Sequence, residues 1–209
     1  RYESFLTPPS LYYVSNVTKK VAQLKPVFNS NGLVMEQRIT KSKDGTEIPY
    51  FVVRRENTEF NGKNPTLLYG YGGFNLPQKP GYLNATGKVW LERGGVYVLA
   101  NIRGGGEFGP KWHQAALKEN RQRAYDDFIA VAEDLIYLEI TSPKHLGIRG
   151  GSNGGLLMGV MLTQRPDLFN AIVCQVPLLD MLRFHKLLAG ASWMGEYGNP
   201  DLSEEWEYI

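Results

Sequence analysis

The chain has 209 residues, of which 43% are hydrophobic, 12% aromatic and 21% charged, a composition that supports a packed core. Its 23 basic and 21 acidic side chains nearly balance, and no basic run or acidic tail indicates a nucleic-acid partner. The single cysteine, Cys174, excludes an internal disulfide framework, and we expect a buried, inert thiol. No stretch approaches the roughly 18 apolar residues that span a bilayer. The sequence therefore predicts a soluble protein without a membrane partner, for which the cytoplasm and the periplasm fit equally well.

The first 25 or so residues read as a separate β-rich region. Residues 4–6, 12–16 and 21–24 are short and β-prone, and Pro8-Pro9 and Lys19-Lys20 interrupt them. We expect these pieces to be strands of a unit that begins before Arg1.

From about residue 33 the pattern predicts alternating strands and helices. Residues 33–39 and 47–54 flank Asp44-Gly45, a strong hairpin signal. Further strands are expected at 66–69, 95–100, 145–149 and 171–176. One helix is expected at 154–164. Another should begin at Asp126-Asp127, because two acids suit a helix N-terminus, and should end at Ser142-Pro143. This alternation predicts a mostly parallel α/β sheet, in which ligands bind at the carboxyl ends of the strands.

The pentapeptide Gly150-Gly151-Ser152-Asn153-Gly154 matches G-x-S-x-G and lies between a predicted strand and a predicted helix. On such a sharp turn the serine hydroxyl projects above the sheet, and glycines are needed because the backbone is crowded. We expect Gly155 and Gly159 to let the helix lie close to the sheet. A glycine-rich turn with an uninvolved serine is the alternative, but the strand before and the helix after favour Ser152 as a nucleophile.

Three further segments accompany this pentapeptide in a fixed order. They are YGYGGFN at 69–75, ANIRGGGEFG at 100–109, and SW at 192–193 followed by EYG at 196–198. Together with GGSNGGLL at 150–157 they resemble the prolyl oligopeptidase family of serine peptidases, and the resemblance extends over most of the chain from about residue 40.

The resemblance implies an α/β-hydrolase domain capped by a β-propeller that admits only short peptides. Residues 1–25 would be the end of the propeller-like β domain and the crossover, and residues 26–209 the N-terminal part of the peptidase domain. The expected fold class is α/β, a partial α/β-hydrolase fold whose mostly parallel sheet carries helices on both faces.

The resemblance also implies the parts of a catalytic site. Ser152 matches the nucleophile, Asn153 would supply a backbone N–H to the oxyanion hole, and Tyr71 would supply its hydroxyl as the second donor. A neutral O–H aimed at a developing negative charge suits this role because its hydrogen bond strengthens in the transition state.

Three aromatic residues match the pocket for the residue before the cut bond: Trp193, Phe74 and Tyr197. Proline presents a flat apolar ring and no N–H, so an aromatic slot suits it without a polar partner. Ordinary core packing is the alternative for each of the three.

The acid and histidine of the triad follow the serine along the chain in α/β-hydrolases. Only one predicted strand follows Ser152, so we expect both partners beyond Ile209. Asp180 and His185 have the right order, but their loop comes too early in the sheet. His113 and His145 precede the serine, and we expect surface or core roles for them.

No metal or cofactor is expected. The three histidines lack metal-ligand spacing. The G-x-G-x-x-G match at 104–109 fails as a dinucleotide site, because the acid that should end a second strand is here Asp126 or Asp127, at the start of a predicted helix. It is expected to be a loop near the active site.

The resemblance thus implies that the parent protein is a serine endopeptidase that hydrolyses short peptides on the carboxyl side of proline through an acyl-enzyme, and that the chain as given is an inactive fragment of it. Its partners would be a short proline-containing peptide and the missing C-terminal part of the same protein. An esterase or other acyl hydrolase of the same fold is one alternative, and a non-catalytic fragment is the other.

Overall fold

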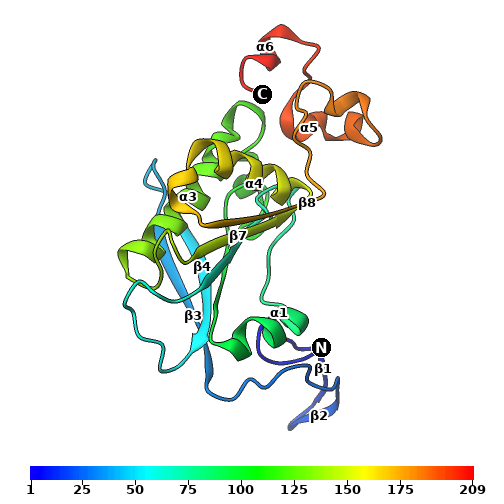
Figure 1. Ribbon diagram of the computed structural model, residues 1–209. Coiled ribbons are helices and arrows are strands. Elements are labelled where there is room, and N and C mark those ends of the chain that lie inside the picture. Colours follow the sequence, from blue (N-terminus) through cyan, green and yellow to red (C-terminus); the bar gives the residue numbers. More distant parts are fainter.

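The computed structural model describes residues 1–209 as a small β-hairpin and a larger sheet with helices (Figure 1). The hairpin consists of β1 (Ser10–Val14) and β2 (Thr18–Gln23). The main sheet consists of β3 (Leu33–Lys41), β4 (Glu47–Arg55), β5 (Thr66–Tyr69), β6 (Val96–Ala100), β7 (Leu146–Gly151) and β8 (Ala171–Gln175). The helices are α1 (Asn84–Val89), α2 (Pro110–Gln114), α3 (Gln122–Tyr137), α4 (Asn153–Gln164), α5 (Met194–Tyr197) and α6 (Ser203–Trp206). None of them is both long and apolar enough to cross a membrane.

The strands of the main sheet lie in the order β3-β4-β6-β5-β7-β8. β4 pairs antiparallel with β3 and β6, whereas the pairs from β6 to β8 are parallel. This arrangement confirms the predicted α/β class with a mostly parallel sheet. Because parallel strands share one carboxyl edge, the loops after β5, β6 and β7 meet there, where ligands bind in such sheets.

The β3–β4 hairpin forms where Asp44-Gly45 predicts it. Its register runs without interruption from Leu33 opposite Arg55 to Lys41 opposite Glu47. In the turn, Gly45 has φ +84°, a conformation that glycine adopts without strain, and Asp44 Oδ1 accepts a hydrogen bond from the Thr46 N–H at 3.1 Å.

The N-terminal strands differ from the prediction in position. Residues 4–6 form no strand: residues 5–7 form a bend, and the Ser4 hydroxyl oxygen accepts hydrogen bonds from the N–H groups of Leu6 and Thr7. Lys19 and Lys20 lie inside β2 and do not interrupt it, because both faces of this hairpin strand are exposed and a charged side chain carries no desolvation cost there.

The two faces of the main sheet are covered by different parts of the chain, as expected for helices on both faces. Alternating side chains of β4 and β6 point to opposite sides, so Val52 and Val98 join one core with α3 and α4. Val53 and Leu99 join a second core with Leu91 and the N-terminal segment that contains Phe5 and Phe28. Figure 1 shows α3 and α4 on one side of the sheet and α1 near the N-terminus, away from them.

Helix α3 begins four residues before the predicted start at Asp126 and ends at Tyr137. Its two acids therefore lie beyond the first turn and do not act at the helix N-terminus.

Asp127 is fully buried and accepts hydrogen bonds from Arg103. The Arg103 backbone N–H donates at 2.9 Å, and the guanidinium Nη2 lies 2.6 Å from Asp127 Oδ1. The same guanidinium donates to Asp44 and holds the pKa of that carboxyl well below its usual range. This ion cluster joins the β3–β4 turn to the loop after β6.

We expect Asp127→Asn to destabilise the fold by about 3 kcal/mol, because the buried Arg103 charge then keeps only the exposed Asp44 carboxylate as its counter-charge. The adjacent Asp126→Asn is the matched control, since Asp126 contacts only the exposed Gln122 amide. Urea denaturation measures both free energies of unfolding. Equal and small losses would show that the Asp127 carboxylate does not stabilise the fold.

Candidate active site

Ser152 stands on the turn between β7 and α4 with φ 57° and ψ −118°, a region that non-glycine residues rarely occupy. Its N–H donates to the Gln175 carbonyl oxygen on β8 at 3.0 Å, and its own carbonyl oxygen accepts from the N–H groups of Gly155 and Leu156. These hydrogen bonds fix the strained turn from both sides. The residue itself is exposed at the carboxyl edge of the sheet.

Close backbone packing requires glycine at positions 150 and 155, as the sequence predicts, but not at position 151, where a Cβ would find its nearest neighbour 3.7 Å away. A Cβ on Gly150 would lie 2.2 Å from the Gly154 carbonyl oxygen, and one on Gly155 would lie 2.7 Å from the Gln175 carbonyl oxygen. Gly159 serves a different purpose from the predicted one. Its missing Cβ leaves space for the Leu179 side chain, so it packs against the segment after β8 rather than the sheet.

A cavity of about 230 Å³ opens beside Ser152. It brings together four residues that the sequence singles out, and its lining consists of Tyr71, Phe74, Leu76, Ser152, Leu178 and Trp193. These side chains come from the loops after β5, β7 and β8 and from the short helical turn Gly190–Trp193. A larger cavity of about 570 Å³ lies between α3, α4 and the C-terminal residues and does not include Ser152.

Two hydrogen-bond donors lie close to the Ser152 hydroxyl. Burial raises the pKa of the Tyr71 phenol above its ordinary value, and an interaction with the Ser152 side chain opposes this only in part, so Tyr71 is a neutral donor at neutral pH. The Asn153 backbone N–H, the first of α4, makes no hydrogen bond within the chain. A free N–H next to the serine in the chain and a neutral O–H in the same cavity are the kinds of group that can stabilise a negatively charged oxygen.

Tyr197 lies behind the cavity and does not line it. The residue is 3% exposed, and its ring packs edge-on against Phe74, with 5.7 Å between the ring centroids. Its hydroxyl donates to Asn153 Oδ1 at 2.7 Å. Its contact with the pocket is therefore indirect, through Phe74, because the short helix α5 turns the phenol inward.

Two charged residues that the sequence analysis did not single out lie beneath the cavity. Arg121, at the start of α3, donates from Nη2 to Asn153 Oδ1 at 2.5 Å and from Nη1 to Glu196 Oε1 at 3.0 Å. Glu196 is the first residue of the EYG motif, so the sequence pattern could have indicated it as a site residue. No sequence pattern indicates Arg121. His113, expected in a surface or core role, lies with its Nε2 2.8 Å from Glu196 Oε2.

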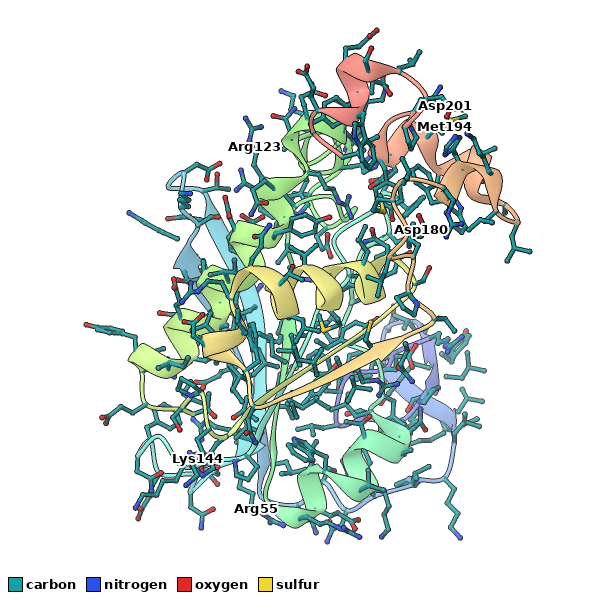
Figure 2. All side chains as sticks on the ribbon, turned by 45° about the horizontal axis from the view of Figure 1, so that its top comes forward. Arg55, Arg123, Lys144, Asp180, Met194 and Asp201 are labelled. Atoms are coloured by element: carbon teal, nitrogen blue, oxygen red, sulfur yellow. The ribbon has the colours of Figure 1, made fainter.

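Asp180 and His185, which follow Ser152 in the order of a triad, do not form a triad with it. Asp180 pairs with Arg183, and His185 Nε2 lies 3.0 Å from Asp201 Oδ2. Figure 2 shows Asp180 and Asp201 in the C-terminal part of the chain, beyond α4. Neither Asp180 nor His185 lines the cavity at Ser152, and His145 contacts the Ser142 hydroxyl instead.

The glycine-rich segment 104–109 lies where it was expected, next to the site. A Cβ on Gly104 would meet the Gly72 carbonyl oxygen at 2.4 Å, and one on Gly106 would meet the Asn75 carbonyl oxygen at 2.3 Å. The segment therefore packs against the loop that carries Tyr71. Across residues 1–209, no three His, Cys, Asp or Glu side chains gather as metal ligands would.

The prediction of a buried thiol at Cys174 is wrong. The residue is exposed, although its Sγ contacts the Gly155 carbonyl oxygen at 3.2 Å and partial burial raises the pKa of the thiol. The reason is the place of β8, which pairs only with β7 and so leaves its residues largely uncovered.

A serine held in a strained strand-to-helix turn above a mostly parallel sheet is the arrangement that defines the α/β-hydrolase class. Residues 82–209 match the prolyl oligopeptidase family. The chain belongs to this family.

Individual relatives agree with this assignment. The chain is 58% identical over 202 residues to an uncharacterised peptidase of Sinorhizobium fredii, a match that covers 95% of this chain and 28% of the relative. It is 42% identical over 212 residues to the prolyl endopeptidase of Elizabethkingia meningoseptica, covering 100% of this chain and 30% of that protein. The structure of a post-proline cleaving enzyme from Rickettsia typhi superposes with a TM-score of 0.94 at 48% identity, over 99% of this chain and 30% of that one. The chain thus spans less than a third of the length of these proteins.

We expect Gly150→Ala to destabilise the turn by roughly 1–3 kcal/mol, because the new Cβ meets a backbone oxygen that cannot move without displacing α4. Gly151→Ala is the matched control, since the nearest atom to its Cβ would be 3.7 Å away. Thermal and urea unfolding measure both variants. A Gly150 variant as stable as the Gly151 variant would contradict the packing argument.

Proposed function

We propose that the protein to which this chain belongs is a serine peptidase that hydrolyses short peptides on the carboxyl side of proline. The observation that carries the proposal is the meeting of Ser152, Tyr71, Phe74 and Trp193 in one small cavity at the carboxyl edge of the sheet. A nucleophile, an oxyanion donor and an aromatic slot are the elements that this reaction requires. The prolyl endopeptidases among the relatives support the same substrate class.

In the proposed reaction, the Ser152 Oγ attacks the carbonyl carbon of the proline residue while a general base takes the hydroxyl proton. The developing oxyanion is stabilised by the Asn153 backbone N–H and the Tyr71 hydroxyl. The C–N bond then breaks, the amine leaves with a proton from the same base, and an acyl-enzyme remains on Ser152. Water adds to this ester and releases the acid, which regenerates the serine.

The aromatic side chains of the cavity supply the specificity in this proposal. Trp193 and Phe74 both line the cavity, are each partly buried, and offer apolar faces to a proline ring. Proline has no N–H to satisfy, so a slot without a polar partner accepts it at no cost in lost hydrogen bonds. Tyr197 contributes by holding Phe74 from behind.

We further propose that the acid and histidine of the triad come from residues beyond Ile209. The chain covers only 28–30% of the length of its relatives, which supports this proposal. The outer edge of β8 has no partner strand, so further strands of the sheet can pair there. The β1–β2 hairpin fits the proposed end of a propeller-like domain in residues 1–25. Without the triad partners the 209-residue chain would keep only residual catalysis.

The decisive experiment is covalent labelling of the full-length protein with an organophosphonate probe for serine hydrolases. Wild type should be labelled at Ser152, and Ser152→Ala should abolish labelling because the attacking oxygen is gone. Ser15→Ala, which changes an exposed serine in the β1–β2 turn, is the control and should label normally. Labelling of the Ser152 variant at another serine would overturn the assignment.

An esterase of the same fold is the competing function, and Trp193→Ala separates the two. If the protein is a prolyl peptidase, the variant should lose the buried apolar contact between the indole and the proline ring and the additional attraction of aromatic stacking. Together these losses weaken transition-state binding by roughly 2–4 kcal/mol. This corresponds to about 30- to 1,000-fold in kcat/KM for a proline-containing peptide.

The control for this variant is a small activated ester that does not enter the slot. Its hydrolysis by Trp193→Ala should stay close to that of the wild type, so the ratio of the two substrates changes. Equal losses on both substrates would show that Trp193 has a structural role and would remove the case for proline specificity.

A further inference from the structure

A buried carboxylate holds three segments around the cavity together. Glu196 is 5% exposed, and its Oε1 accepts hydrogen bonds from the Phe74 backbone N–H at 2.8 Å and from Arg121 Nη1 at 3.0 Å. Its Oε2 lies 2.8 Å from Nε2 of His113, on α2. Glu196 is itself three residues beyond Trp193, on the segment that forms one wall of the cavity.

The Arg121 guanidinium extends these contacts to the turn that carries the serine. Nη2 donates to Asn153 Oδ1 at 2.5 Å, and the guanidinium carbon lies 5.2 Å from the centre of the Tyr197 ring. Asn153 Nδ2 in turn donates to the Tyr71 carbonyl oxygen at 2.6 Å. Arg121, Glu196 and Asn153 are all buried.

These hydrogen bonds form a closed ring through one loop. The loop after β5 is held at Tyr71 by Asn153 and at Phe74 by Glu196, and Arg121 connects the two holding groups. Phe74 has φ 56°, an unfavourable conformation for an aromatic residue, so this loop needs fixed contacts at both ends.

We propose that Arg121 and Glu196 are positioning residues that set the distance between the Ser152 turn, the Tyr71 hydroxyl and the Trp193 wall. The inference rests on the proposed function, because it assigns the pair to that same site. It adds two residues that touch neither the serine nor the cavity and act through Asn153 and Phe74.

The chemistry of the pair favours positioning over stabilisation. A buried ion pair is weak evidence for stability, because desolvation of two charges offsets their attraction. An arginine, however, presents a planar fork whose two terminal nitrogens reach two acceptors in fixed directions. Lysine carries the same charge, but its three donors share one rotatable nitrogen, so it does not hold Glu196 and Asn153 at the two separate positions that the guanidinium nitrogens fix.

Arg121→Lys in the full-length protein tests the inference. Loss of one charge-assisted hydrogen bond to the Asn153 side chain should lower kcat for a proline-containing peptide by about 10- to 100-fold. KM should change less than about threefold, because the oxyanion contacts strengthen in the transition state. Organophosphonate labelling of Ser152 should slow by a similar factor, since it uses the same turn.

Arg123→Lys is the matched control, on the same helix and with the same chemical change. Arg123 is exposed, donates to the Ala115 carbonyl oxygen at 3.2 Å, and lies at the surface of the molecule in Figure 2. Its kinetics should equal those of the wild type.

Glu196→Gln provides a second variant if the lysine variant does not fold. The amide keeps the shape and one acceptor oxygen, but it removes the charge that Arg121 faces. It should show the same kcat loss with little change in KM. In both variants, hydrogen exchange at the Phe74 amide should accelerate, whereas amides in the centre of β6 should exchange as in the wild type.

The outcomes separate this inference from the proposed function. A wild type that neither reacts at Ser152 nor cleaves the peptide would overturn the proposed function, while the exchange comparison would still test the ring of hydrogen bonds. An active wild type whose two variants match it in kcat, labelling rate and Phe74 exchange would overturn the positioning role. Losses that follow only the fraction of folded protein would also overturn it, because they would show a purely structural pair.

Discussion

Close backbone packing at the turn between β7 and α4 is the constraint on which the cavity depends. No side chain fits on Gly150 or Gly155, so the chain passes from strand to helix without any bulk at the point where the two elements touch. The turn places Ser152 outward in a strained conformation and Asn153 inward, where it is fully buried. The buried amide then requires partners, and the surrounding loops are arranged to provide them.

The site is built in two layers with opposite chemistry. The wall that faces the cavity is mainly aromatic and aliphatic, whereas the layer beneath it is an arrangement of charges and amides centred on Arg121 and Glu196. Hydrogen bonds are stronger in this buried layer than in water, and an unpaired group there is costly. Polar groups below therefore fix the positions of apolar groups above, which cannot orient one another by dispersion forces alone.

Much of this architecture could be predicted from the sequence. Short apolar runs indicate the parallel strands, and G-x-S-x-G between a strand and a helix indicates the position of Ser152. The Arg121–Glu196 pair could not be predicted, because the two residues are 75 positions apart and no local pattern joins them. The exposure of Cys174 could not be predicted for a related reason. An apolar run indicates that a strand can be buried, but it does not show whether another strand or helix covers it.

The hydrogen bond between Phe74 and Glu196 has a consequence for synthesis on the ribosome. It joins residues 122 positions apart, and at about 5–20 residues per second the ribosome needs on the order of 10 seconds to add that length. Throughout this interval the loop that carries Tyr71 has emerged but lacks one of the groups that hold it. The strands beneath it can pair earlier, so the sheet can form before the cavity, and the nascent chain can pass through a stage in which the scaffold exists and the cavity beside Ser152 does not.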